Sequence, residues 1–542
     1  MTDRRKQSII AGGLTSSAGI FLSKALGILY VSPFTALATE ANTAYYAYAY
    51  SIYDLLLRIS LAGLPFAMAA LVAKYMVKDD IKTVILIRKL SMSVMAVFGF
   101  VSMMIVLLFS KGIATLIVTD NMTAETLLRT QNVLMIISLA LFVVPLLSSF
   151  RGFYQGLKYL KEYAFSQVLE QLSRILFLLG MGFLAVVIFK QDSIWAVYFA
   201  VLSTSVSALI SIFQFLFLDR KIYKNLKSKA DLQESEPANP KEILIELFNF
   251  SIPFFLMSLF SSSFSISNLF LFNRSMYLIS DNESQIKLLY SMIMYTTNKL
   301  TSIPQVLAPG FSIAIIPYIT ASYERNDIKE VRKYITDALN TVLYLAIPLS
   351  FVLYFLSEPI YYVMYGSQNV ALGSTVLRIS TLLALTGTIS PVVTTIMMSL
   401  RMKRNAMTNW IIGFFINMLT IMPLIYFFDF YGSILSAALS AAYVIFVSLF
   451  QVRKTLKIRY KKTLRLLFLM ILGMVGFYAV SVLFNWVFGD PTGYPRLIML
   501  VILGIASILC LSVYFVSTYM LQVPQAIFGE NFADRIVRRF KR

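Results

Sequence analysis

Long apolar runs dominate this sequence of 542 residues. A helix needs about 20 apolar residues to cross the hydrocarbon core of a bilayer, and roughly fourteen runs of that length occur along the chain. Because hydrophobic residues make up 58% of the chain and charged residues only 14%, the runs cannot all be buried inside a soluble domain. Continuous runs such as Ile175–Phe189 also lack the alternation of barrel strands. The sequence therefore predicts an all-α polytopic membrane protein with about fourteen transmembrane helices.

Basic residues outnumber acidic ones, which gives a net charge of +20. If the N-terminus lies inside the cell, roughly 36 of the 47 Lys and Arg residues fall on the cytoplasmic side of the predicted spans. Such a bias sets the orientation of membrane helices and favours contact with anionic lipid, so it explains the charge without nucleic acid. We expect a multi-pass membrane protein that has both termini in the cytoplasm and no nucleic-acid partner.

The chain has no histidine and one cysteine, Cys510. The absence of histidine removes the commonest general base and metal ligand, and a single cysteine cannot form an intramolecular disulfide. We therefore expect no metal site, no cofactor and no histidine-based catalysis. A membrane enzyme that builds lipid-linked glycans stays an alternative, but it would need a cluster of acids or bases and a sizeable outer domain.

One charged, proline-containing segment at Asp219–Glu242 interrupts the apolar pattern and separates two groups of roughly six spans each. An even number of spans starts both groups on the same side, so a repeat between them must be parallel. Leu61–Lys82 resembles Leu307–Lys329, which supports such a repeat. The predicted parts are an N-terminal lobe (1–220), a cytoplasmic linker (221–242), a C-terminal lobe (243–456), two further spans (457–522) and a basic amphipathic tail on the cytoplasmic membrane surface (523–542).

Charged residues inside the predicted spans are the first candidates for function. A lone Lys, Arg or Asp at the centre of a span costs roughly 2.5–3.5 kcal/mol, so such residues are expected to face water, protein or a charged ligand. We interpret four of them as the lining of a polar cavity that binds an anionic cargo near the midplane, between the two lobes. These predicted substrate-binding residues are Lys24, Asp54, Arg58 and Lys299.

The spacing within the second span leaves an alternative open. Asp54 and Arg58 are four residues apart and can neutralise each other along one helix face. That pairing would leave Lys24 and Lys299 uncompensated, so the cavity would still be cationic.

Other intramembrane residues are secondary candidates. Glu170 and Arg174 are again four residues apart, and they indicate either a structural polar network inside one lobe or a contact with cargo. Arg378 either lines the second lobe or extends outward to the membrane surface. Prolines break or bend spans, so we expect an irregular eighth span beside Lys299, with a hinge at Pro304, Pro309 and Gly310.

Two stretches resemble a known family. The run RGFYQGLKYLKEYAFSQVLEQLSR at Arg151–Arg174 resembles the RGxxQG…SQxxEQxxR signature of lipid-linked oligosaccharide flippases of the MOP superfamily, in the MurJ (YtgP) and SpoVB branch of Gram-positive bacteria. NKLTSIPQVLAPGFSIAIIPYIT at Asn298–Thr320 resembles the eighth span of that family, with Lys299 at the position of a cavity arginine. FLSKALGILY places Lys24 at the first arginine of the family's SRxLGxxR pattern, with Tyr30 replacing the second.

The resemblance also has departures. Arg58 matches one of the paired basic residues of the second span, whereas Asp54 has no clear counterpart. A proline that usually precedes the SQ pair of the signature is absent, and Lys161, Glu162 and Tyr163 stand in its place.

The resemblance implies a flippase in the bacterial cell membrane rather than an enzyme. Its cargo would be lipid II, the undecaprenyl-pyrophosphate-linked precursor of peptidoglycan, moved from the inner to the outer leaflet by alternating access. Membrane potential or an ion gradient could drive the cycle, and the expected partners are this glycolipid, membrane lipids and the cell-wall synthesis machinery. Alternatives are a flippase for another polyprenyl-linked polysaccharide and a MATE-type drug or cation antiporter, whose cavity should be acidic.

Overall fold

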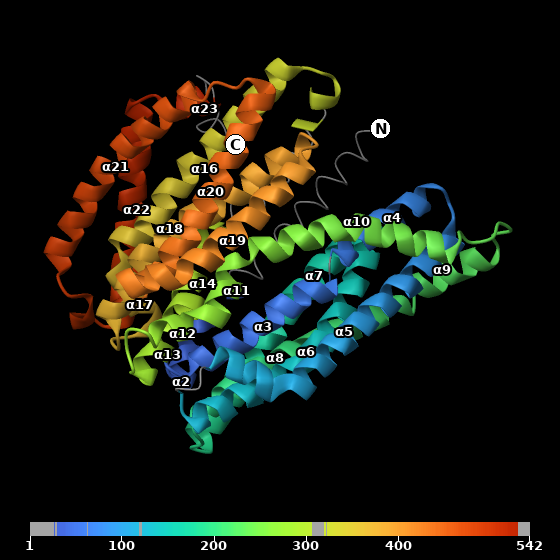
Figure 1. The fold of residues 1–542 in the computed structure, drawn as a ribbon, viewed down its shortest axis with the longest axis horizontal. Helices are drawn as coiled ribbons and strands as arrows, with labels where there is room; N and C mark the ends of the chain where they lie inside the picture. The colour runs from blue at the N-terminus through green and yellow to red at the C-terminus, as the bar shows by residue number, and fades with distance from the viewer. Residues whose placement is uncertain are drawn as a thin grey trace. The chain divides into compact units, whose positions relative to one another are not determined.

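The computed structural model describes residues 26–27, 30–61, 63–118, 122–305, 319–320 and 322–528. Within these ranges the regular elements are all helical (Figure 1). Ten helices are long and apolar enough to cross a membrane, or up to 11 if the bent pair Phe255–Ser261 and Ser263–Met276 is one span. The predicted all-α polytopic membrane protein is thereby confirmed. Lys24, Pro309, Gly310 and most of the predicted basic tail lie outside the described residues.

The second predicted span differs from the expected continuous apolar helix. It consists of α3 (Thr43–Leu61) and α4 (Leu64–Val77), and Gly63 between them has a positive φ of 74°. Glycine adopts this left-handed conformation without a Cβ clash, so the chain can change direction there. The 19 residues of α3 include five tyrosines, which bring hydroxyl groups into this predicted span.

The chain forms two compact units, Met1–Tyr295 and Thr296–Arg542. This division differs from the predicted lobes, because the helices after the predicted linker pack in the first unit. Helix α10 (Pro240–Ser261) contacts α3 and α4, and α13 (Glu283–Ser291) contacts α3. The first unit also contains α2 (Val31–Ala38), α5 (Ile81–Ile117), α6 (Ala124–Gly156), α7 (Leu160–Phe183), α8 (Ile194–Asp219), α9 (Ile222–Asp231), α11 (Ser263–Ser267) and α12 (Asn273–Met276).

Helix α6 is the centre of the first unit. It packs against α3, α4, α5 and α8, and its most apolar stretch is 67% buried, compared with 22% for α5. Close approach to α4 requires glycine, because a Cβ on Gly152 would lie 2.7 Å from the carbonyl oxygen of Pro65. The remaining surfaces of α5 and α7 are apolar and exposed, as expected for helices that face lipid.

The segment predicted as a linker contains a packed helix, α9, which contacts α5 and α8. Leu226 and Ala230 are four residues apart and are buried on its inner face. Nearby, Arg88 of α5 forms a buried ion pair with Asp219, and its guanidinium lies 4.0 Å from the ring centroid of Tyr223. The sequence did not predict this short amphipathic helix, because charged residues dominate the segment. A helix of this length needs tertiary contacts, here with α5 and α8, to be stable.

The second unit contains three layers of packed helices. Helices α16 and α18 contact each other, α19 and α20 form an adjacent pair, and α21 and α22 form a third pair, drawn in red in Figure 1. Helix α21 packs on α16 through an apolar cluster that includes Tyr344, Phe477 and Tyr514. The bounds are α14 (Thr297–Gln305), α16 (Ile328–Phe355), α17 (Ser357–Tyr365), α18 (Val370–Ser399), α19 (Lys403–Phe428), α20 (Tyr431–Leu456), α21 (Lys461–Phe488), α22 (Arg496–Met520) and α23 (Val523–Phe528).

Candidate functional site

Asp54 and Arg58 lie one turn apart on α3 and form an ion pair. The distance from Arg58 Nε to Asp54 Oδ2 is 2.8 Å, so the predicted pairing along one helix face is confirmed. Arg58 also donates from Nη1 to Ser258 Oγ of α10 at 2.9 Å, a partner that the sequence did not reveal. The Arg58 side chain is still 33% exposed. A guanidinium has five N–H donors, and these two bonds use two of them.

A row of tyrosines precedes this pair on α3. The rings of Tyr46 and Tyr50 stack with centroids 4.3 Å apart, and Tyr46 lies 5.1 Å from the ring of Tyr295. Tyr30 and Tyr46 share a hydrogen bond between their hydroxyls at 3.3 Å. Tyr30, Tyr46 and Tyr295 are almost fully buried, so they form a rigid, polar core that positions the following turns of the helix.

Glu170 of α7 lies between two arginines. Its carboxylate accepts from Arg174 at 2.5 Å along the same helix and from Arg151 of α6 at 2.8 Å. Arg151 is fixed further by a 2.9 Å bond from its Nε to Ser166 Oγ. These three charged side chains are only 14–18% exposed. The predicted pairing of Glu170 with Arg174 is confirmed, and the structure adds Arg151, which belongs to the same RGxxQG…EQxxR signature.

Lys299 lies on α14 in the second unit and is partly buried. A π-helical turn, η3 (Met292–Thr296), directly precedes this helix. The helix continues through the buried Pro304 to Gln305 and packs against α18 and α16. The irregularity in the described part of this span therefore precedes Lys299. The hinge at Pro304, Pro309 and Gly310 and the common cavity for Lys24, Asp54, Arg58 and Lys299 stay predictions.

Arg378 has local partners at the junction of α17 and α18. Its Nε donates to Ser357 Oγ at 2.7 Å, and its Nη2 lies 3.9 Å from Glu358 Oε2. Both charged side chains are 44% exposed. Arg378 thus joins two neighbouring helices, which weakens the case for a role in cargo binding.

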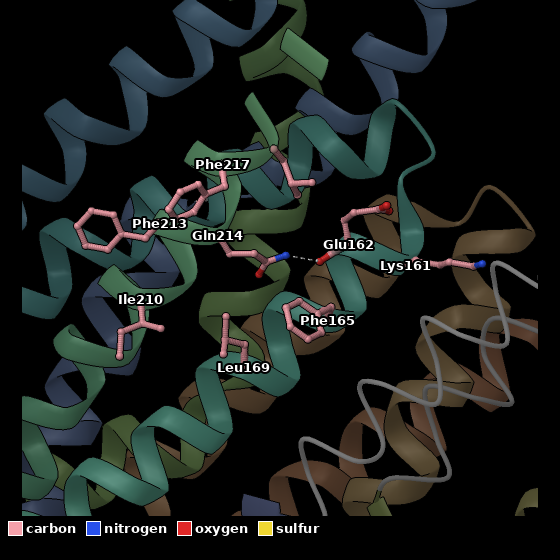
Figure 2. Close-up of a pocket in the computed structure, with 9 residues that line it drawn as sticks. Lys161, Glu162, Phe165, Leu169, Ile210, Phe213, Gln214 and Phe217 are labelled. Atoms are coloured by element: carbon pink, nitrogen blue, oxygen red, sulfur yellow. Dashed lines mark hydrogen bonds between the residues drawn. The ribbon is translucent and has the colours of Figure 1, made fainter. Parts of the chain in front are cut away.

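An apolar groove of about 740 Å³ runs between α7 and α8. Figure 2 shows Phe213 and Phe217 on α8 with Phe165 and Leu169 on α7, while Gln214 donates to the carbonyl oxygen of Glu162 at 3.2 Å. The groove contains no cluster of acids and bases. Across the described part of the chain, no group of three or more His, Cys, Asp or Glu residues could hold a metal ion.

The fold is the one seen in solved membrane transporters of the MOP superfamily. An inward-facing multidrug MATE transporter of that superfamily aligns with a TM-score of 0.65 and 12% identity, over 81% of this chain and 94% of its own. The structure of lipid II flippase MurJ in an inward closed conformation aligns with a TM-score of 0.62 and 16% identity, over 94% and 99%.

Sequence comparison adds the family. Residues 9–323 match the family described as "Polysaccharide biosynthesis protein", and this chain belongs to it. Residues 293–422 also match the MatE family. The lipid II flippase MurJ of Bacillus subtilis (strain 168) is 28% identical over 536 residues, which cover 96% of this chain and 97% of that protein. The resemblance found in the sequence is confirmed.

Proposed function

We propose that this protein is a lipid II flippase, which moves the polyprenyl-pyrophosphate-linked precursor of peptidoglycan from the inner to the outer leaflet by alternating access. The observation that supports this most is the similarity to lipid II flippase MurJ along nearly the whole length of both chains. A flippase needs no catalytic acid or base, because no covalent bond changes.

The intramembrane charges fit an anionic cargo. A pyrophosphate and its sugars cannot cross hydrocarbon without polar partners, and cationic side chains offer charge-assisted hydrogen bonds to phosphate oxygens. Both carboxylates among the candidates, Asp54 and Glu170, are already paired with arginines. Lys299, Arg58 and Lys24 are the proposed phosphate ligands, and the polyprenyl tail stays in the surrounding lipid.

A MATE-type cation antiporter is the second candidate, supported by the MatE match. It would need a carboxylate that an organic cation can reach. Asp54 accepts from Arg58 and Glu170 lies between two arginines, so the described candidate residues favour anions over cations.

The topology and energy source complete the proposal. Both termini lie in the cytoplasm, which places most basic connections inside, and the cell-wall synthesis machinery receives the cargo outside. Moving about two negative charges outward across 100 mV, inside negative, gains roughly 4–5 kcal/mol if the whole field is crossed. The membrane potential would therefore favour export.

The test is complementation of a Bacillus subtilis strain depleted of its own lipid II flippases, with lipid II outside measured by an externally added probe. The wild-type chain should restore exposure, and Arg58→Ala or Lys299→Ala should reduce it by about tenfold or more, since each loses a charge-assisted bond to phosphate. Lys111→Ala, an exposed cation on α5, is the matched control at equal membrane levels. Failure of the wild-type chain to expose lipid II while it exports organic cations would overturn the proposal in favour of the antiporter.

A further inference from the structure

A second cationic site lies within the second unit. A cavity of about 650 Å³ opens where α16 begins, where α20 ends and where α21 begins. The charged residues that line it are Arg332, Lys333, Asp337, Lys457, Arg459 and Lys462.

The charges of this pocket are not balanced. It has five cations and one carboxylate, and none of the five forms an ion pair within 4.0 Å with a described residue. Arg332 donates from Nε to the carbonyl oxygen of Leu456 at 2.6 Å, and Lys462 donates to the carbonyl oxygen of Ala526 at 3.0 Å. These two bonds fix the walls of the pocket but use neutral acceptors. Like charges gathered in one cavity repel each other, and a bound anion would remove that repulsion.

The backbone holds one of these cations in an unfavourable conformation. Lys457 ends α20 with φ of 53° in the left-handed region, where glycine is the usual residue. The adjacent Ile458 is buried and anchors the turn. Lys457 therefore lines the cavity at a position where the left-handed backbone would cost less free energy with glycine.

The position of the pocket along two predicted membrane-spanning helices favours a lipid as its ligand. Arg332 and Lys333 lie in the first two turns of α16, and Lys462 lies in the first turn of α21; both helices are long and apolar enough to cross a membrane. Residues at such positions lie at the level of lipid headgroups. About three turns further along α16 and about two turns further along α21, the partly buried Leu343 and Leu469 provide an apolar continuation.

We propose that this pocket binds the phosphate group of an anionic phospholipid from the cytoplasmic leaflet. The cations would share the phosphate oxygens by charge-assisted hydrogen bonds, while the acyl chains remain in the bilayer. The site is independent of cargo transport, because none of its residues belongs to the proposed phosphate ligands of the flippase.

The experiment uses the full-length protein in nanodiscs and native mass spectrometry, with phosphatidylglycerol as the probe in a phosphatidylcholine background. The wild-type protein should retain phosphatidylglycerol, and Lys333→Gln/Arg459→Gln should reduce that retention roughly tenfold, since each cation near a membrane surface contributes to anion binding. Lys227→Gln/Lys229→Gln on α9 is the control, because it removes two exposed cations of the same predicted membrane face. An unchanged unfolding midpoint in phosphatidylcholine alone would show that each variant is folded.

Three outcomes would overturn the proposal. Equal losses in both double variants would indicate a diffuse surface charge rather than a pocket. Unchanged retention in Lys333→Gln/Arg459→Gln would place the lipid elsewhere. Displacement of phosphatidylglycerol by millimolar inorganic phosphate would indicate a site for soluble phosphate instead of a lipid.

Discussion

Two groups of charged residues in this protein are built in opposite ways. In the first unit, Glu170 lies between Arg151 and Arg174, and these side chains are less than a fifth exposed. In the second unit, the basic pocket at the ends of α16, α20 and α21 gathers five cations around Asp337. The first group consists of ion pairs, whereas the cations of the second form none with the described residues.

The difference indicates what each group is for. Charges that are buried and paired hold helices together, because separating them would leave an uncompensated charge in a medium of low dielectric. Cations that repel each other do not stabilise the fold by themselves. Their clustering is therefore better explained by binding of an anion. The comparison predicts that removing a charge from the first group lowers the free energy of unfolding. Removing a cation from the second group should not lower it.

The largest expected effect is that of Glu170→Ala. Loss of this carboxylate leaves Arg151 and Arg174 unpaired among buried side chains, which should destabilise the protein by about 3–5 kcal/mol. The measurement is the thermal unfolding midpoint in one detergent, with Glu234→Ala in an exposed connection as the control. A midpoint unchanged from wild type would break the comparison, since it would mean that the network has no structural role.

A smaller effect of opposite sign is expected for Lys457→Gly. Glycine relieves the left-handed backbone and removes one repelling cation, so stability should rise by about 0.5–1 kcal/mol. Lys454→Gly, in the last turn of α20, should instead lower it by up to a similar amount, because glycine disfavours the helical conformation that Lys454 adopts. If Lys457→Gly melts earlier than wild type, the lysine has a stabilising partner, and the positive charge of the pocket is compensated.

The smallest effect concerns Asp192, which lies in the connection before α8. A hydrogen bond from the backbone N–H of Ile194 holds the pKa of this carboxyl below its usual range, and Arg129, 2.7 Å away, lowers it further. A depressed pKa means that the ionised group stabilises the fold above its unfolded pKa of about 3.9, and that this stability is lost as the pH falls through the folded pKa.

Asp192 is half-exposed, so solvent screening limits the effect to about 0.5 kcal/mol or less. Asp192→Asn should melt slightly earlier than wild type at pH 7, and the two curves should converge as the pH falls through the folded pKa of Asp192. A difference that grows on acidification would contradict the assigned direction. This exposed pair thus provides a reference for the much larger effect expected at Glu170.

Much of the local chemistry could be predicted from the sequence. Asp54 with Arg58 and Glu170 with Arg174 are four residues apart, and side chains at that spacing meet on one helix face whatever surrounds the helix. The packed helix α9 could not be predicted, because its two buried residues stabilise it only after α5 and α8 are in place. The contacts of Arg58 with Ser258 and of Glu170 with Arg151 join different helices, so no local pattern encodes them.

The sequence by itself determined that this protein is an all-helical membrane protein and which charges enter the membrane. The reason is that the hydrocarbon core constrains the length and composition of each span separately, so each span can be recognised from its own residues. Only the tertiary structure decided which of those charges are neutralised and where cations gather without an ion pair to any described residue. Electrostatic compensation depends on distances between helices that are remote in the sequence, and packing alone sets those distances.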